Sequence, residues 1–402
     1  MPWALSCLPG LIVVASVSGV LGAGKAPPPD AWIDPTTGHR VMRLSRREGS
    51  NSSFYFHQNP FTAQGDKMVF MGTTPGGRRA FAVHLETLEI EQITDRNSGH
   101  EVVAPKRREL IYRTGPVVYA THVDTHKTRQ IGRIRDAWTR GGGFSVNADE
   151  TLLLGCFAEG IAPFFKKPRS KWFTEIYEAK LPNALYTIEI ETGKARVIYR
   201  RNTWLGHVQF SPTNPGLLMF CHEGPWHLLD RIWLIRSDGT GLEQIHRRTV
   251  AREIWGHEFW GPAGRRVWFD LQIPRGKTFY LAGADVATGN EIRYPLTRDQ
   301  WCVHYNVSAD GTMFCGDGGG ARSVAGAKDG KWIHLFRPRG ARLDVERLCN
   351  LAEHDYRLEP NVHFTPDGKW VVFRSNRHGT SQVYAVEVAR SGSRRPESRP
   401  PR

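Results

Sequence analysis

A hairpin pattern recurs along the chain, and it constrains the fold more than any other feature of the sequence. Each copy joins two short apolar runs through a turn rich in Asp, Asn and Gly, which is typical of two antiparallel strands. The copies occupy residues 60–72, 102–115, 144–157, 210–221, 259–270, 306–317 and 363–376. Between copies there is room for two further strands about a polar turn, as in residues 80–94 and 184–199.

Seven copies with four strands each predict an all-β fold, a seven-bladed β-propeller over residues 31–390. One four-stranded blade has two apolar faces and cannot cover both alone, so neighbouring blades must stack into a closed ring. Hydrophobic residues make up 40% of the 402, with 13 Trp among them, which is ample for such a core. Only the basic and aromatic insertion 164–180 suggests a helix, and we expect it to form a rim or lid over the site.

The two ends of the chain differ from the repeats. Residues 5–23 are apolar with small residues near their end, so we predict a signal peptide over 1–24 and a periplasmic or secreted protein. A membrane anchor is the alternative, although the run is short and interrupted by Gly. The tail 391–402 is basic and rich in Pro, and we expect it to be disordered.

Cysteine usage and charge narrow the class of protein further. Five cysteines follow the predicted signal peptide without a CxxC pair, so we expect buried thiols rather than a disulfide framework or a zinc ribbon. The formal net charge of +14 favours an anionic partner: nucleic acid, anionic lipid or an acidic polysaccharide. No block rich in Lys or Arg interrupts the strands. We therefore expect an acidic saccharide, no nucleic acid, and no stable membrane association once the signal peptide is removed.

Histidines recur at the start of strand-like runs in several copies of the repeat. They are His57, His207, His257, His304 and His363. In a propeller such positions converge on one mouth of the central channel, where imidazoles can hold a divalent metal. The alternative is that each histidine packs locally and donates to a backbone carbonyl.

Two shorter patterns contain further candidate ligands. His222 and His227 flank a Gly-Pro turn, which could hold two ligands or be purely structural. Glu359, Asn361 and His363 alternate along the chain, so on a strand their side chains would point to one side. They could face a cation together, or they could form a polar edge strand.

At these same residues the chain resembles the oligogalacturonate lyases, a family of polysaccharide lyases with seven-bladed propellers. The resemblance extends over residues 33–388. Its most specific motifs are WLGH at 204–207, CHEGPWHLLDRIWLI at 221–235, GHEFW at 256–260, CVH at 302–304 and FTPDG at 364–368. The combination of CHEGP with a later HEFW is not expected from another propeller family.

The resemblance implies a carbon–oxygen lyase that degrades pectin fragments by β-elimination with manganese. A base removes the proton on carbon 5 of a uronate, and the glycosidic oxygen on carbon 4 leaves. That proton is too weakly acidic unless the neighbouring carboxylate is neutralised by a metal or a cation. His207 matches the general base of the family, and His257 matches one of its metal ligands.

The remaining family positions differ in this chain. Glu359 and Asn361 stand where the family has histidines, so these two, with His363 and His304, are the other candidate metal ligands. Tyr356 replaces a glutamine, and Ala184 replaces an arginine of the family. Arg200, Arg201 or a basic residue of the insertion could take over the role of that arginine, and His222 is a further candidate for substrate binding.

Two functions are consistent with these departures. The chain is a lyase with an altered site, or it is a propeller that binds acidic glycans without cleaving them. A charge-neutralising group within reach of His207 would favour the lyase. A protein-interaction scaffold needs only the fold and has no support from a site.

Overall fold

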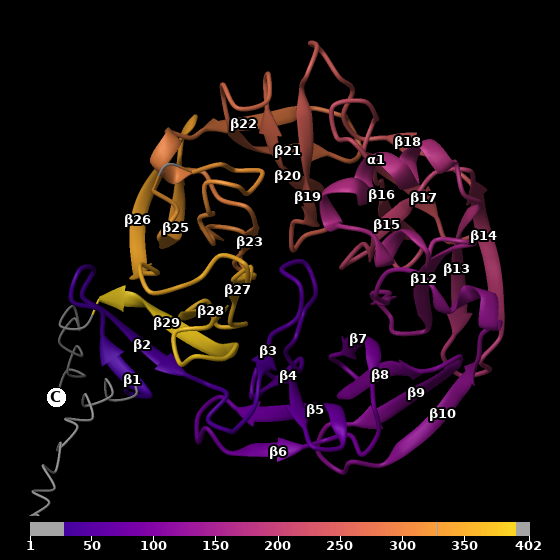
Figure 1. The fold of residues 1–402 in the computed structure, drawn as a ribbon, viewed down its shortest axis with the longest axis horizontal. Coiled ribbons are helices and arrows are strands. Elements are labelled where there is room, and N and C mark those ends of the chain that lie inside the picture. The colour runs from indigo at the N-terminus through magenta and orange to yellow at the C-terminus, as the bar shows by residue number, and fades with distance from the viewer. Residues whose placement is uncertain (1–27, 328, 391–402) are drawn as a thin grey trace, which may run out of the picture.

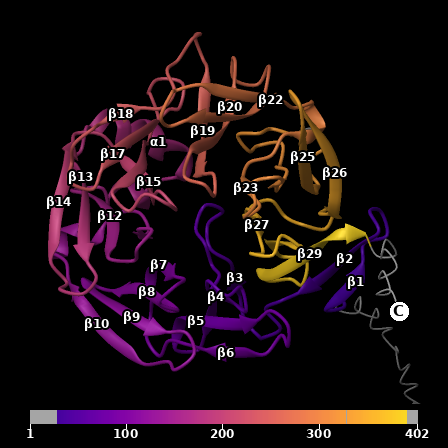
Figure 2. The same cartoon turned by 180° about the vertical axis from the view of Figure 1, so that it is seen from behind.

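A computed structural model describes residues 28–327 and 329–390, and it confirms the seven-bladed β-propeller (Figures 1 and 2). Seven antiparallel sheets surround one axis, and six of them consist of four strands that follow one another along the chain. The predicted signal peptide 1–24 and tail 391–402 lie outside the described residues.

The strands of each blade run in chain order from the axis to the rim, except in the last blade. The first six blades are β3 Asn51–Ser52, β4 Lys67–Thr74, β5 Gly77–His84, β6 Ile90–Gln92; β7 Gly99–Ala104, β8 Glu109–Thr114, β9 Val117–His122, β10 Thr128–Arg133; β11 Ser145–Val146, β12 Leu152–Ala158, β13 Asn183–Glu189, β14 Ala195–Arg201; β15 Leu205–Phe210, β16 Leu217–His222, β17 Ile232–Arg236, β18 Glu243–Gln244; β19 Ile254–Trp260, β20 Arg266–Gln272, β21 Tyr280–Asp285, β22 Glu291–Pro295; and β23 Tyr305–Val307, β24 Phe314–Gly316, β25 Trp332–Arg339, β26 Arg342–Asn350.

The seventh blade closes the ring with strands from both ends of the described chain. From the axis outward it contains β27 His363–Phe364, β28 Trp370–Ser375, β29 Gln382–Arg390, β2 His39–Arg43 and β1 Ala31–Ile33. Strand β2 pairs with β29, with Val41 opposite Val386. Because every inner strand then has a blade on each side, no apolar face is left uncovered.

The core lies between the blades, where strands are buried on both faces. Strand β20 is an example, since all of its residues after Arg266 are buried. The five cysteines among the described residues are free and buried, as predicted. Within the described ranges, no helix is long and apolar enough to cross a bilayer.

The insertion between β12 and β13 contains the predicted helix. It folds as a short 3-10 helix, η2 Phe164–Lys166, followed by α1 Arg169–Ala179. Two other 3-10 helices, η1 Asp136–Thr139 and η3 Arg298–Gln300, lie between strands elsewhere.

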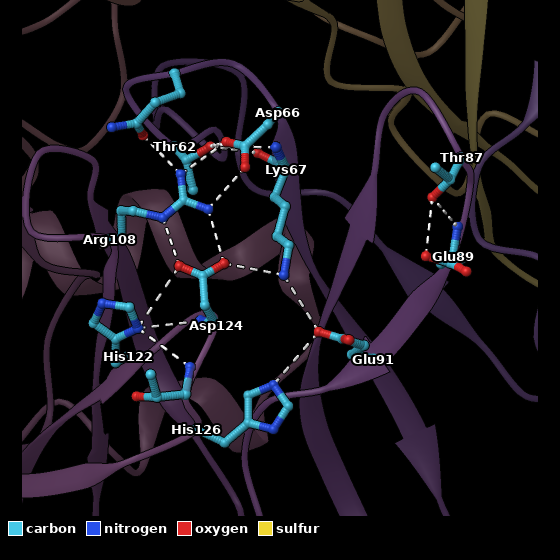
Figure 3. Close-up of polar contacts among 12 residues, drawn as sticks. Thr62, Asp66, Lys67, Thr87, Glu89, Glu91, Arg108, His122, Asp124 and His126 are labelled. Atoms are coloured by element: carbon cyan, nitrogen blue, oxygen red, sulfur yellow. Dashed lines mark hydrogen bonds and ion pairs between the residues drawn. The ribbon is translucent and has the colours of Figure 1, made fainter.

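A network of ion pairs joins the first two blades at their surface (Figure 3). Arg108 of the second blade contacts Asp66 of the first at 2.8 Å and Asp124 at 2.6 Å. Lys67 contacts Asp124 at 3.0 Å and Glu91 at 3.3 Å. Hydrogen bonds from Arg108 hold the pKa of both Asp66 and Asp124 well below the usual range.

We expect Arg108→Gln to lower the free energy of unfolding by about 1 kcal/mol at neutral pH, because a partly exposed network contributes little more than that. Both carboxyls have a lower pKa in the folded chain than in the unfolded chain. Their contribution is therefore complete above about pH 4 and is lost as the pH falls below that value. Thermal denaturation across this range measures the effect.

The control for this change is Arg339→Gln, which removes an exposed arginine that pairs with Asp344 alone. That variant should unfold like the wild type. The free energies of unfolding of Arg108→Gln and the wild type should become more alike as the pH falls. If they did not, the two aspartates would not be the source of the stabilisation.

Candidate active site

Three inner strands carry a Gly-His dipeptide at the point where their pairing with the next strand is interrupted. The register shifts directly after that glycine in β7, β15 and β19. The histidines in these bulges, His100, His207 and His257, have positive φ angles of 59°, 47° and 44°. A bulge redirects a side chain, and a positive φ is unfavourable for a residue with a Cβ, so these conformations suggest a functional constraint.

A loop from the first blade fills the middle of the ring. Residues 53–60 leave the inner strand after β3 and return to it at Phe61, which pairs with Met68 (Figure 1, the indigo loop at the centre). Asn361 accepts the Phe56 N–H at 3.0 Å, and the Asn306 amide donates to the Phe56 carbonyl at 3.0 Å. We call residues 53–60 the central loop.

The central loop places an aromatic floor between the converging histidines. The Tyr55 ring lies 5.5 Å from that of His207 and 5.3 Å from that of His304, measured between ring centroids. Phe56 stacks on His304 at 4.8 Å. The Tyr55 ring therefore contacts both His207 and His304 edge to face.

Two histidines beside this floor are each held by a fully buried aspartate. His257 Nδ1 lies 3.0 Å from Asp270, and His304 Nδ1 lies 2.7 Å from Asp317. Burial alone would raise the pKa of the Asp317 carboxyl, but His304 and backbone hydrogen bonds lower it below its usual value. An ionised aspartate accepts the Nδ1 proton, so Nε2 of its histidine is left as an acceptor or ligand atom.

These two histidines are close enough to act on one ion. Their ring centroids are 4.8 Å apart. His304 Nε2 is buried and has no hydrogen-bond partner, and a carboxylate oxygen of Glu359 lies 3.9 Å from it. A buried nitrogen without a hydrogen-bond partner costs free energy unless it binds a ligand. We call His257, His304 and Glu359 the two-histidine centre.

A second cluster surrounds His207 and is organised by one buried cation. His207 Nδ1 lies 3.0 Å from Glu258, while Arg231 contacts Glu258 at 3.2 Å and Glu223 at 2.5 Å. The Arg231 side chain is fully buried. Burial would raise the pKa of Glu258, but Arg231 and His207 hold it well below the usual range. His207 therefore lies between two carboxylates, with Glu258 beside Nδ1 and a Glu223 oxygen 3.9 Å from Nε2.

A metal is less favoured at this second cluster than at the two-histidine centre. His207, Cys221 and Glu223 do present ligand atoms within 4.8 Å of one another. However, Arg231 already neutralises Glu223, and burial raises the pKa of the Cys221 thiol well above its usual value, so the thiolate is not available. The cluster instead suits a histidine base.

The insertion packs against residues that flank β15 and β16 of the fourth blade, and the start of its helix reaches Glu359 of the seventh. Phe173 of α1 packs against Trp204, with 5.7 Å between ring centroids. At the start of the same helix, an Arg169 nitrogen lies 3.9 Å from Glu359. Gly224 of the CHEGP motif has a φ of 148°, and a Cβ there would lie 3.1 Å from Tyr177 of α1. The predicted lid is thus seated on that motif.

Several predicted site residues lie away from the two clusters or have their polar atoms engaged. The Asn361 amide bonds Phe56 and the Glu359 carbonyl, and His363 Nε2 donates to the Tyr55 carbonyl at 3.1 Å. Burial lowers the pKa of His363 to about 4. Both residues therefore support the central loop through these contacts, and the Nδ1 of His363 is buried without a hydrogen-bond partner in the described part of the chain.

The predicted substrate-binding residues are either packed between aromatic rings or placed on an outermost strand. His222 packs between Phe220 and Trp233, and burial lowers its pKa to about 4. Arg200 and Arg201 end β14, the outermost strand of the third blade.

The structure adds residues that the sequence analysis did not single out. Asp270 and Asp317 each end a copy of the hairpin repeat, and this shared position was an available signal for them. Tyr55 and Arg231 had no such signal. His100 shares the Gly-His dipeptide with His207 and His257, but its Nε2 accepts from Arg113 at 2.7 Å, so it lacks a carboxylate partner.

The central channel also contains a cavity that lies outside the two-histidine centre. A cavity of about 450 Å³ is lined there by residues from all seven blades, including His57 and His363. Burial and the neighbouring His207 lower the pKa of His57 to about 3. His57 is therefore neutral at ordinary pH and lies apart from the two-histidine centre.

Comparisons with known proteins agree with this geometry. A family model described as oligogalacturonate lyase matches residues 29–392. The oligogalacturonate lyase of Dickeya dadantii (strain 3937) is 27% identical over 375 residues, covering 89% of this chain and 95% of the relative. A structure of an oligogalacturonate lyase in complex with manganese aligns with a TM-score of 0.80 at 26% identity, covering 90% of this chain and 96% of that one. The oligogalacturonate lyase from Vibrio parahaemolyticus gives a TM-score of 0.79 at 25% identity, covering 89% and 96%.

Proposed function

Because the chain belongs to the oligogalacturonate lyase family, we propose that its active site cleaves oligogalacturonate by metal-assisted β-elimination. The protein is a polysaccharide lyase. The observation that supports this mechanism is the presence of two histidine–carboxylate clusters on either side of Tyr55. The two-histidine centre has side chains that can bind a cation, and the cluster around His207 has a histidine that can act as a base.

The two-histidine centre fits manganese, the metal bound by the structural relative. His257 and His304 would contribute their Nε2 atoms, and Glu359 would contribute its carboxylate. Imidazole together with carboxylate is a donor set that first-row divalent metals accept. The partnerless Nε2 of His304 and the aspartates behind both rings support the assignment. When bound, the metal supplies positive charge that neutralises the uronate carboxylate and makes the proton on carbon 5 more acidic.

His207 is the proposed base. A proton on Nδ1, which lies 3.0 Å from Glu258, would leave Nε2 to accept the proton from carbon 5. Arg231 keeps Glu258 ionised, so the tautomer of His207 is maintained. This arrangement favours a lyase over a propeller that only binds acidic glycans, because a saccharide-binding site would not need a base held in one tautomer.

Tyr55 is proposed to bind the oxygen that leaves carbon 4. Its ring lies between His207 and His304, and no hydrogen bond joins its hydroxyl to the described part of the chain. The reacting proton and the leaving oxygen are on adjacent carbons, so a donor to that oxygen must lie within one sugar ring of the base. Tyr55 meets this condition.

Export of the protein is a separate proposal, supported by the apolar run 5–23 with small residues at its end. The propeller would act in the periplasm or outside the cell. Amino-terminal sequencing of the protein from an expressing cell should give a start between Ala23 and Ala26. A mature chain that began at Met1 would contradict export by cleavage.

We expect His207→Ala to lower kcat/KM for trigalacturonate by roughly 10² to 10⁴-fold, because a positioned base contributes about that much. The ultraviolet absorbance of the unsaturated product measures the rate, with manganese and then with a chelator. His100→Ala is the matched control, since it removes a histidine from an equivalent bulge without a carboxylate partner. Full activity in His207→Ala would exclude His207 as the base.

We expect Asp317→Asn to weaken manganese binding by about 10 to 100-fold, because the aspartate orients the His304 ligand. Electron paramagnetic resonance of free Mn²⁺ measures the affinity without requiring turnover. Asp344→Asn, an exposed change in the same blade, should bind manganese like the wild type. If the wild type and both variants bound manganese equally well, His304 would not be a ligand of the metal.

A further inference from the structure

The helix α1 is packed along one side, and its first residue is exposed. Its Ile176 is buried in a cluster with Ala158 and Ile161, and Phe173 packs against Trp204. Trp172 of the first turn packs against Phe165, whereas the side chain of Arg169 is 75% exposed. The helix therefore presents Arg169 at the mouth of the channel from a firmly packed base.

The contact between Arg169 and Glu359 joins parts of the ring that are far apart. Arg169 belongs to the insertion of the third blade, whereas Glu359 directly precedes β27 of the seventh. The guanidinium lies 3.9 Å from Glu359 Oε1, and both side chains are more than one-third exposed. Exposed pairs of this kind are weak and readily exchange partners.

Arg169 is an exposed cation beside Glu359, and it differs in this from two other arginines near the clusters. Arg231 is fully buried and paired with two glutamates. Arg374 donates to the Glu359 carbonyl at 2.7 Å and to Ser52 at 2.7 Å. Within residues 28–327 and 329–390, the one ion pair of Arg169 is its 3.9 Å contact with Glu359, and the planar guanidinium fork matches a carboxylate.

We infer that Arg169 binds a second uronate carboxylate of the substrate and that Glu359 couples this event to the two-histidine centre. The inference rests on the proposed function and adds to it a carboxylate-binding residue that is coupled to the metal centre. One free carboxylate would lie at the two-histidine centre and another at Arg169. The substrate is therefore an oligouronate with at least two neighbouring unesterified acids.

Glu359 provides the link, because its two oxygens serve different partners. Oε1 lies 3.9 Å from Arg169, and Oε2 lies 3.9 Å from His304 Nε2. When a substrate carboxylate pairs with Arg169, Glu359 loses this ion-pair partner and becomes available as a ligand in the two-histidine centre. By reciprocity, metal and saccharide then strengthen one another's binding.

The test measures Mn²⁺ affinity by electron paramagnetic resonance in a His207→Ala background, where saccharide binds without being cleaved. Digalacturonate should tighten Mn²⁺ binding by about tenfold, a size common for coupled sites. Adding Arg169→Gln should tighten the binding of Mn²⁺ alone, because Glu359 loses its competing partner. It should also reduce the effect of digalacturonate to less than about twofold, and Arg169→Lys should give an intermediate value.

Two controls isolate the role of Arg169. Arg357→Gln removes an exposed arginine from the same loop as Glu359, where it pairs with Asp355, and it should keep the full coupling. The fully methyl-esterified disaccharide should not tighten Mn²⁺ binding in any variant. Unchanged coupling in Arg169→Gln, with saccharide still bound, would overturn this inference alone. Absence of saccharide binding in the His207→Ala background would overturn both it and the proposed function.

Discussion

Closure of the ring is the constraint on which the rest of this structure depends. Each blade has two apolar faces, and all of them are covered only when β2 joins β29 in the seventh blade. Closure also fixes the direction of every inner strand toward one axis. Residues that are far apart in the sequence, such as His207 and Glu359, therefore reach one mouth of the channel without any contact between their own blades.

The repeat gives the blades an equivalent backbone, and the side chains beside each histidine make the blades chemically different. Opposite the glycine of the Gly-His dipeptide, the second strand has Arg113, Cys221 or Asp270. The same bulge thus places three histidines in different surroundings. His100 bonds to an arginine, His207 lies beside a carboxylate of the next blade, and His257 bonds to an aspartate of its own blade. One local geometry serves three different chemistries because the charge beside the ring decides what its free nitrogen can do.

The site also depends on one irregular segment. The central loop 53–60 interrupts the inner strand of the first blade and brings Tyr55 and Phe56 between the histidines. Asn361 and His363 hold that loop through its backbone, although their alternating pattern had suggested ligands. Polar residues at the end of a strand satisfy buried backbone groups as readily as they bind a cation, and the pattern alone does not separate the two roles.

The sequence by itself determined the number of blades, the helical insertion and the convergence of His207, His257 and His304, because hairpin periodicity and ring closure dictate where equivalent positions lie. It did not determine which charges accompany those histidines. Arg231 belongs to the fourth blade and Glu258 to the fifth, and Arg169 and Glu359 are separated by most of the ring. Such partners follow from the packing of blades and from the path of an insertion, and no local pattern records either. The tertiary structure alone decided which histidine stands beside a buried cation and which faces a carboxylate that can reach a metal.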